Sequence, residues 1–506
     1  MIKDLRTAIR NDRNLQFILF FAFAIQIIFC ITATGFYHTD QHFQVVEFSS
    51  QQLGDPSGFP FVWEYDHPVR STIQVYLFSG YHLLLKNIGI SDPYLELTIL
   101  RIFFGVAMFI LFNVMALYYF KDDKKIIPYS VLILLNFSWF LPYVKTLFSS
   151  EMFSSLLFFG AIFWYDVKKD KKLSGFFLLA IGFLLALAFY VRFQTGFFIA
   201  GFGLWMLLKR QNIANYLFMA IGFVAASILN TWLDYAYYQQ LIITPYEYFY
   251  TNIIDKRAAS FGSSSFLRYI GLLIAVVGVI PLSIILFFYS TKSFLKKYTH
   301  VIFFATIFFI IGHSMVGHKE ERFMFPVLCV MPIFIGWGLP GLIKFYTSAK
   351  KNFRHLLKGI IAISIILNFL LLFLLMFNPY CQTAHFTSKL KNHFKKNDSI
   401  TNLYFLNRTA FETESKVPLM FYKRSFDNLN VIRINGEELK SFKENDDYLA
   451  ATFDQAVKEK NTIDSLGFEP VFYSSDFLWG VNNFLSSRKI QVINEIWVLY
   501  KKTSRQ

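Results

Sequence analysis

Long apolar runs separated by short polar segments make up most of the first 380 positions of the chain. Many of the runs approach the roughly twenty residues that an α-helix needs to cross a bilayer. The pattern therefore predicts about eleven transmembrane helices, of which the window 193–208 is the shortest. The apolar windows are 14–35, 97–120, 126–144, 151–167, 173–191, 193–208, 213–233, 267–290, 299–315, 323–343 and 356–377.

The polar segments between these windows alternate in charge, and every second segment is basic. The basic ones are the N-terminus, KDDKK (121–125), KKDKK (168–172), KR (209–210), KSFLKK (292–297) and KFYTSAKKNFR (344–354). Because basic loops stay in the cytoplasm, the other segments should face outward. The outward set is 36–96, 145–150, 192–195, 234–266, 316–322 and the tail after 378. An odd number of spans follows.

After about residue 380 the pattern changes to short alternating apolar runs. ITNLYFLN, NLNVIRIN, DYLAATFD, PVFYSS and IWVLYKK are typical of strands, and DQAVKEKNTIDSLG and SDFLWGVNNFLSS of helices. We expect a membrane domain over 1–378 and a small extracytoplasmic α/β domain over 379–506, acting as a lid or as a docking module for the acceptor. Asn397 and Asn407 lie in N-x-[ST] patterns, which matter only in a glycosylating compartment.

The composition agrees with a polytopic membrane protein: 55 % of the 506 residues are hydrophobic, 16 % are charged and mean hydropathy is +0.42. The net charge of +15 lies in clusters between apolar runs, which indicates topology signals and not nucleic-acid binding. The three cysteines form neither a disulfide framework nor a metal pattern. The first apolar run lacks a cleavage site and is read as a retained helix.

The outward segments carry unusual polar residues. In the first, Asp40, Gln44 and Glu47 would share one face of an α-helix. A turn region with Gly54, Pro56, Gly58 and Pro60 should join two short interfacial helices. The aromatic residues Phe43, Trp63 and Tyr65 either stack on a sugar or dip into lipid. Further polar residues of the outward segments are Glu64, Asp66, His67, Arg70, Lys145, Glu151, Arg192, Gln194, Asp234, Thr244 and Asn252, together with the stretch HKEERFMFP (318–326).

Polar groups gathered at one membrane face commonly line a cavity reached from that side. The blocks HTDQHFQVVE, WEY, KTLFSSE, VRFQT, TPYEYFYTN and HKEERFMFP also resemble the signature blocks of glycosyltransferase family twenty-two, over about residues 30–340. The resemblance implies an all-α GT-C membrane fold and an inverting mannosyltransferase. It implies a polyprenyl (dolichyl)-phosphate mannose donor, a glycolipid or lipid-linked glycan acceptor, and no metal or other cofactor. Where the family often has Pro-Asp-Glu, this chain has Thr39, Asp40 and Gln41, and FGSSSFLRY (261–269) replaces a usual Pro-Trp.

An inverting transfer needs a base for the acceptor hydroxyl and cations for the departing phosphate. Asp40 is the expected base, with Glu47 as the alternative base or as a ligand of sugar hydroxyls. His318, Lys319 and Arg322 are expected to bind phosphate, while Glu320 and Glu321 pair with these cations or bind sugar. The alternative is a structural ion-pair cluster. Additional substrate-binding candidates are Arg192, Arg70, Glu64, Glu151 and Gln44.

Two other functions fit less well. A GT-C transferase could use another polyprenyl-phosphate sugar, such as an arabinose or a hexosamine. A glycolipid transporter would show inverted repeats and polar groups at mid-membrane, and neither is evident in the sequence. Phe, Ile, Lys and Asn richness favours a bacterial inner-membrane protein with a periplasmic active site, the alternative being the endoplasmic reticulum with a lumenal site. The other expected partner is membrane lipid.

Overall fold

The computed structural model describes residues 2–54, 62–277, 279–297, 299–395, 400–413, 417–426, 428–442, 448–493 and 495–502. The chain divides into two compact units. Unit 1 comprises Met1–Ile31, His67–Leu77 and Leu100–Met376, and unit 2 comprises Thr32–Asp66, Phe78–Ile99 and Phe377–Gln506. The sheet domain at the C-terminus therefore forms one body with much of the first outward segment. The predicted turn at 56–60 and Asn397 lie outside the described residues.

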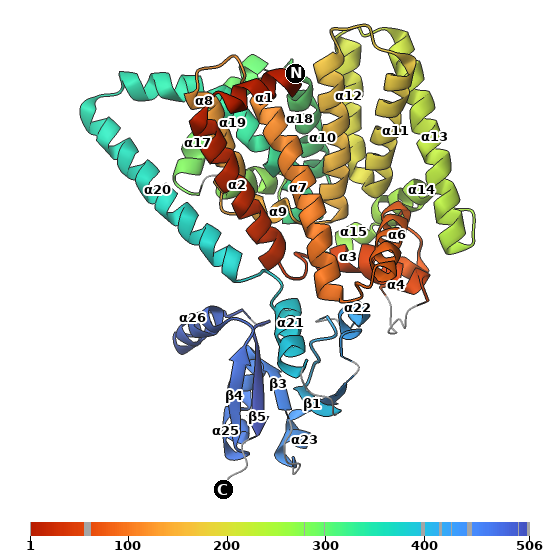
Figure 1. Ribbon diagram of the computed structural model, residues 1–506, viewed down its shortest axis with the longest axis vertical. Coiled ribbons are helices and arrows are strands. Elements are labelled where there is room, and N and C mark those ends of the chain that lie inside the picture. Colours follow the sequence, from red (N-terminus) through yellow and green to blue (C-terminus); the bar gives the residue numbers. More distant parts are fainter. Residues whose placement is uncertain are drawn as a thin grey trace. The chain divides into compact units, whose positions relative to one another are not determined.

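Unit 1 is helical (Figure 1). Its elements are α1 (Ile2–Arg10), α2 (Arg13–Thr32), α8 (Ile126–Phe137), α9 (Leu141–Val144), α10 (Ser150–Lys168), α11 (Gly175–Val191), η2 (Phe193–Thr195), α12 (Gly196–Leu208), α13 (Ile213–Tyr238), α14 (Thr244–Phe249), η3 (Tyr250–Ile254), α15 (Arg257–Ser260), α16 (Arg268–Val276), α17 (Leu282–Lys297), α18 (Val301–Met315), η4 (Glu321–Met324), α19 (Phe325–Ser348) and α20 (Lys351–Phe377). Two further helices have residues in both units, α6 (Ile73–Asn87) and α7 (Pro93–Tyr119).

The helices coincide with the predicted apolar windows. Among the described residues, α2, α7, α13, α19 with η4, and α20 are long and apolar enough to cross a membrane, and α8, α11, α12 with η2, and α18 are shorter apolar helices. Two windows are not single helices: a break separates α8 from α9, and another separates α16 from α17. Pro142 and Pro281 lie at these breaks, and proline cannot donate the backbone hydrogen bond that continues a helix.

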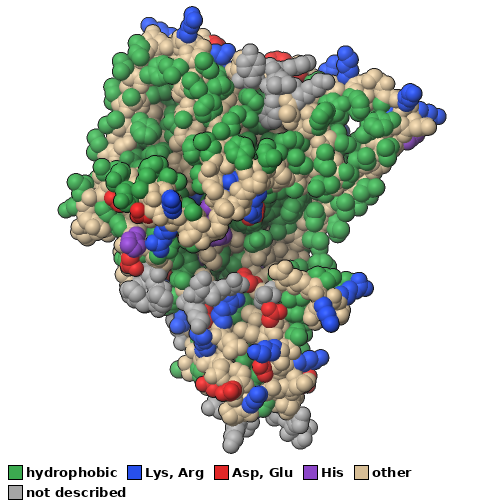
Figure 2. Space-filling view, turned by 180° about the vertical axis from the view of Figure 1, so that it is seen from behind, with side chains coloured by type: hydrophobic (Ala, Val, Ile, Leu, Met, Phe, Trp, Pro, Cys, Tyr) green, Lys and Arg blue, Asp and Glu red, His purple; other side chains and the backbone are tan. Residues whose placement is uncertain are grey.

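Close packing within unit 1 depends on small residues. A Cβ atom at Gly182 of α11 would lie 1.9 Å from the Met219 carbonyl oxygen of α13, and one at Gly222 would lie 2.1 Å from the Leu179 oxygen. The two backbones therefore touch, as is usual for helices that associate in lipid. Hydrophobic side chains cover the flanks of the helices, and lysine and arginine side chains line one end of unit 1 (Figure 2).

Unit 2 contains a five-stranded mixed sheet in the order β2-β1-β3-β5-β4. The strands are β1 (Thr401–Leu406), β2 (Leu429–Ile434), β3 (Tyr448–Thr452), β4 (Phe468–Tyr473) and β5 (Trp497–Lys502). Strand β1 pairs parallel with β2 and β3, and β5 pairs antiparallel with β3 and β4. All five strands expected from the alternating apolar runs are present. Together with the helices of unit 1, the sheet confirms the predicted fold class.

Alternate residues of each central strand fill two separate cores. Leu403 and Phe405 of β1 join Trp497 in the core on one face of the sheet, and Tyr404 and Leu406 lie in the core on the other. This period of two is the geometry of a strand with both faces covered. The covering and connecting helices are α21 (Gln382–Phe394), α22 (Met420–Lys423), α23 (Gly436–Lys440), α24 (Phe453–Lys458), α25 (Lys460–Ser465) and α26 (Asp476–Ser487).

The first outward segment contributes four short elements to unit 2. They are α3 (Thr39–His42), the π-helical turn η1 (Phe43–Glu47), α4 (Phe48–Gln52) and α5 (Trp63–Asp66). Gly35 has φ +87°, and a Cβ there would lie 2.5 Å from the Cys381 Cβ. The rings of Tyr37 and Tyr380 stack at 4.4 Å. A glycine is thus required where this segment meets the chain entering α21.

Candidate active site

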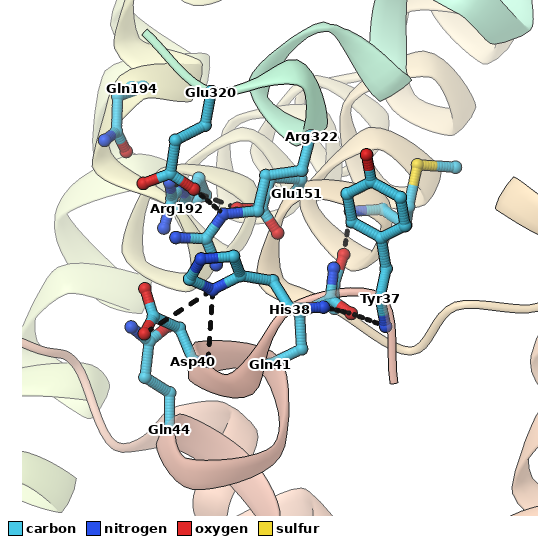
Figure 3. A network of polar contacts seen from close by, with 12 residues as sticks. Tyr37, His38, Asp40, Gln41, Gln44, Glu151, Arg192, Gln194, Glu320 and Arg322 are labelled. Atoms are coloured by element: carbon cyan, nitrogen blue, oxygen red, sulfur yellow. Dashed lines mark hydrogen bonds and ion pairs between the residues drawn. The ribbon is translucent and has the colours of Figure 1, made fainter. Parts of the chain in front are cut away.

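A buried cluster of two arginines and a glutamate lies in unit 1, at three separate helix ends. Glu151 stands in the first turn of α10, which Ser149 caps by accepting the Met152 N–H. Its Oε1 lies 3.1 Å from Nη2 of Arg192, the residue that ends α11, and 3.7 Å from Nε of Arg322 in η4 (Figure 3). A carboxylate at a helix N-terminus is favourably placed, and here it also holds two cations together.

The two guanidinium groups share an aromatic neighbour and are almost fully buried. The Phe323 ring centre lies 5.0 Å from Cζ of Arg192 and 5.5 Å from Cζ of Arg322. Arg192 is 5 % exposed and Arg322 is 3 % exposed. Among the described residues, Nη1 of Arg192 has no hydrogen-bond partner. A buried, charged donor without an acceptor is costly unless a ligand satisfies it, and a guanidinium group prefers a phosphate or a carboxylate.

The remaining charges of HKEERF have separate partners. His318 Nε2 lies 2.8 Å from Glu320 Oε1, and Glu320 Oε2 accepts a hydrogen bond from Arg322 Nε, so a chain of polar contacts leads to the cluster. Lys319 Nζ donates to the Val316 carbonyl oxygen, and burial lowers its pKa from the ordinary value. Glu321 lies 2.7 Å from Arg268 on the surface. The run therefore contains both buried cations and pairing carboxylates.

Arg70 is held by a second, partly buried network in unit 1. Cζ of Arg70 lies 5.2 Å from the ring centre of Tyr248, whose hydroxyl accepts a hydrogen bond from Gln194 Nε2. The Arg70 carbonyl accepts the Tyr238 hydroxyl at 2.9 Å. Asp234 fixes the segment that follows Arg70: one of its oxygens accepts both the N–H and the hydroxyl of Thr72 at 2.7 Å.

Asp234 is 1 % exposed, and its other oxygen accepts from the Thr244 hydroxyl at 2.7 Å and the Asn230 amide at 2.9 Å. In asparagine, an NH₂ group would replace one of the two carboxylate oxygens. That group is a donor, and it would face two donors of the protein instead of accepting from them. We expect Asp234→Asn to destabilise the protein by about 1–3 kcal/mol and to raise KM for the sugar donor by displacing Arg70. The apparent unfolding temperature in detergent and initial transfer rates measure these effects. Exposed Asp255→Asn is the control, and equal behaviour of the two variants would contradict the prediction.

In unit 2, Asp40 lies in the first turn of α3 and is only partly buried. His38 caps this helix: its Nδ1 accepts the Asp40 N–H at 3.3 Å and lies 3.6 Å from Asp40 Oδ1 (Figure 3). Gln41 Oε1 accepts the Tyr37 N–H at 3.1 Å. The amide at position 41, where the resembling family often has Glu, thus caps the helix that presents Asp40.

Glu47 is buried and multiply bonded. Its Oε1 lies 2.8 Å from His42 Nε2 and accepts the Phe421 N–H at 3.0 Å. The His42 ring stacks on Tyr422 at 5.0 Å. Both Glu47 and His42 are at most 3 % exposed. Glu47 therefore joins the first outward segment to α22 within unit 2.

The helical face expected to hold Asp40, Gln44 and Glu47 does not extend to Glu47. The π-helical turn η1 adds a residue to the turn, so Glu47 reaches His42 five positions earlier. Gln44 instead donates to Glu64 Oε2 at 2.9 Å, and both of these side chains are buried. The three polar side chains thus have three different sets of partners.

Glu47→Ala should be strongly destabilising, because it leaves a buried histidine and the Phe421 N–H without an acceptor. We expect a loss of about 3–5 kcal/mol, with faster proteolysis of unit 2. Glu47→Gln keeps an acceptor oxygen and should retain most transfer activity. Exposed Glu469→Ala serves as the control for limited proteolysis. A stable Glu47→Gln protein without transfer activity would instead favour Glu47 as the base.

Sequence reasoning missed several residues of these networks. Phe323 and His42 stand beside residues that were singled out, and Tyr248 lies within the block TPYEYFYTN. Phenylalanine and tyrosine are so frequent here that neither Phe323 nor Tyr248 is distinctive in the sequence. Asp234 was noted only as a polar residue of an outward segment. A carboxylate at the end of a long apolar helix was the available signal for its buried network.

The helices of unit 1 and the sheet of unit 2 define a multi-span membrane protein with a GT-C fold. The crystal structure of ArnT from Cupriavidus metallidurans bound to undecaprenyl phosphate matches with a TM-score of 0.53, covering 97 % of this chain and 98 % of that one at 10 % identity. The apo structure of the same protein matches with a TM-score of 0.50. At this identity the likeness shows the fold alone.

The chain belongs to the Alg9-like mannosyltransferase family, whose sequence profile matches residues 17–414. It is 21 % identical to GPI mannosyltransferase 3 of Debaryomyces hansenii, over 92 % of this chain and 87 % of that protein. It is 23 % identical to human GPI alpha-1,2-mannosyltransferase 3, over 64 % of this chain and 58 % of that protein. These findings confirm the resemblance seen in the sequence blocks and make the protein a mannosyltransferase of class EC 2.4.1.-.

Proposed function

We propose that the protein is an inverting mannosyltransferase that moves mannose from polyprenyl-phosphate mannose to a glycolipid or lipid-linked glycan. One observation carries the proposal: two guanidinium groups are buried together in unit 1, and Nη1 of Arg192 lacks a hydrogen-bond partner among the described residues. A phosphate group fits such a site. The undecaprenyl phosphate named with the ArnT structure supports a lipid phosphate as the ligand class.

The arginine cluster is assigned to the leaving group. During transfer the bond between mannose C1 and the phosphate oxygen breaks, and negative charge grows on the polyprenyl phosphate. Arg192 and Arg322 supply charged donors in a site from which water is largely excluded, where such donors act most strongly. Lys319, whose ammonium group donates to the Val316 carbonyl oxygen, is proposed as a third cation in the same loop as Arg322. Residues of this chain can thus stabilise the phosphate.

Asp40 is assigned to the acceptor. Its carboxylate is partly exposed, and its helix is fixed by the capping interactions of His38 and Gln41. It takes the proton of the acceptor hydroxyl while the hydroxyl oxygen bonds to C1 on the face opposite the departing phosphate. A β-linked donor gives an α-linked mannoside in this way. Gln44 and Glu64, which bond to each other, are proposed to bind sugar hydroxyls.

We assign the reaction to the extracytoplasmic face, which the alternation of basic segments supports. A bacterial inner membrane with a periplasmic site is the preferred location, and the endoplasmic reticulum with a lumenal site is the alternative. The names of the relatives, GPI mannosyltransferase 3 and GPI alpha-1,2-mannosyltransferase 3, support a glycolipid acceptor. The mass spectrum of glycolipids from a deletion strain should contain an acceptor that lacks one hexose.

The donor is tested with purified protein in liposomes that contain lipid extract from the deletion strain. Radiolabelled mannose should be transferred from polyprenyl-phosphate mannose and not from GDP-mannose, and α-mannosidase should release it. Polyprenyl-phosphate glucose and polyprenyl-phosphate arabinose are the matched alternatives. Transfer of either sugar in preference to mannose would contradict the proposed donor, and transfer from GDP-mannose would contradict the lipid-phosphate mechanism.

A further inference from the structure

Helix α26 and the segment after it expose a set of apolar side chains that lies outside both sheet cores. Phe477 is 50 % exposed, Phe484 is 53 % exposed, Ile490 is 51 % exposed and Ile493 is 44 % exposed. Phe477 and Phe484 are seven residues apart, two turns of the helix, and so lie on one side of it. We call these four exposed residues, two on the helix and two on the segment after it, the α26 apolar surface.

The other side of the helix is firmly packed, so the exposure is not a sign of a loose element. Asn482 is fully buried, donates to the Ile493 carbonyl oxygen at 2.7 Å and accepts the Ile493 N–H at 3.1 Å. Trp479 packs on Phe453 and Tyr473 at ring-centre distances of 4.9 and 4.4 Å. The α26 apolar surface is therefore presented to its surroundings in a fixed orientation on unit 2.

Helix α26 begins next to the point where the chain leaves a membrane-spanning helix. The hydroxyl of its N-cap residue, Ser475, donates a hydrogen bond to Asn378 Oδ1. Asn378 directly follows Phe377, the last residue of α20, which is the most apolar of the candidate spans among the described residues. Phe377 and Tyr380 are themselves 65 % and 52 % exposed. The first residue before α26 is thus hydrogen-bonded to the residue that directly follows α20, so the start of α26 lies close to the end of a candidate membrane span.

The charge beside the surface also suits a membrane. Cζ of Arg488 lies 4.1 Å from the ring centre of Phe484, and Lys489 follows it. Both cations are exposed. Aromatic and aliphatic side chains with adjacent Arg and Lys are the composition of interfacial helices, whose apolar side enters the boundary between headgroups and acyl chains while the cations meet phosphate.

We propose that α26 and residues 488–493 lie on the bilayer, with the α26 apolar surface inserted at the level of the lipid headgroups. The occupant of this surface is phospholipid. The proposal concerns how unit 2 is held at the membrane and does not depend on the identity of the sugar donor. A unit held at two points, at the end of α20 and through α26, keeps a defined height above the bilayer.

The test uses the full-length protein in phosphatidylcholine–phosphatidylglycerol liposomes. Phe484→Cys and Ile490→Cys are labelled with bimane, with Lys440→Cys on α23 as the control. The native cysteines are buried, so they are kept, and the unsubstituted protein gives the labelling background. Lipids that carry a nitroxide near the headgroup should quench the labels at 484 and 490 at least about threefold more than at 440.

Equal quenching at the three positions would overturn the proposal. Cross-linking of the Phe484→Cys variant to a second copy of the chain through position 484, without lipid quenching, would also overturn it, because the surface would then be a protein interface. Labelling at exposed positions avoids the loss of folding that core substitutions cause. Arg488→Glu combined with Lys489→Glu should lower the quenching at 484 when phosphatidylglycerol is present, and an unchanged value would contradict the assigned role of the cations.

Discussion

Replacement of Asp40 by asparagine should lower the rate of mannose transfer by about 10²–10⁴-fold, the usual contribution of a general base. Asparagine has nearly the shape of aspartate, and the backbone interactions of His38 and Gln41 that shape α3 do not involve the Asp40 carboxylate. The fold should therefore be unchanged, while the amide cannot accept the acceptor proton. Initial rates in liposomes with polyprenyl-phosphate mannose, at saturating donor and acceptor, measure the effect on kcat.

Asp66→Asn is the matched control, because Asp66 is an exposed aspartate in a short helix of the same outward segment. It should retain transfer close to the unsubstituted rate. If Asp40→Asn and Asp66→Asn are equally active, Asp40 is not the base, and the stable Glu47→Gln protein becomes the decisive comparison.

Replacement of Arg192 by alanine is expected to lower kcat by about 10²–10³-fold, because one charged donor to the leaving phosphate is lost. Arg192→Lys should recover only part of the rate, since an ammonium group cannot donate two parallel hydrogen bonds to one phosphate. Arg192→Ala also takes one cation from the buried Glu151 carboxylate. Apparent unfolding temperature must therefore be measured alongside the rate.

Arg192→Ala combined with Glu151→Gln separates the two effects. The double variant removes the uncompensated carboxylate, so stability should recover while transfer stays low. Arg268→Ala, at an exposed arginine that pairs with Glu321, is the surface control and should transfer normally. Recovery of transfer together with stability in the double variant would mean that Arg192 acts only as a structural partner of Glu151.

The arrangement of helices and strands followed from the sequence because its causes are local. Apolar length predicts a span, and alternation predicts strands such as 401–406 and 497–502. The break after Val276 was not predicted, because residues on both sides of Pro281 remain apolar. The π-helical turn at 43–47 was also missed, since one bond of its last residue, Glu47, comes from the Phe421 N–H, more than 370 residues later.

The sequence predicted which charged residues belong to the candidate site, but not which of them contact one another. Charge alternation predicts an outward position for Glu151, Arg192 and Arg322, but their contact depends on how α10, α11 and η4 pack. The roles of Asp40 and of the arginines remain predictions. Glu321 pairs with Arg268, while Glu320 pairs with Arg322. The sequence alone does not distinguish these two adjacent glutamates, because their partners are set by tertiary packing.

The most direct test is equilibrium binding of polyprenyl phosphate to the purified protein, by native mass spectrometry, for the unsubstituted chain, Arg192→Ala and Arg268→Ala. The account predicts tight binding to the unsubstituted chain and to Arg268→Ala. Binding to Arg192→Ala should be about 10- to 100-fold weaker, as expected for the loss of one charged hydrogen-bonding group. Equal affinity of Arg192→Ala and the unsubstituted chain would contradict the assignment of the buried guanidinium groups to the lipid phosphate.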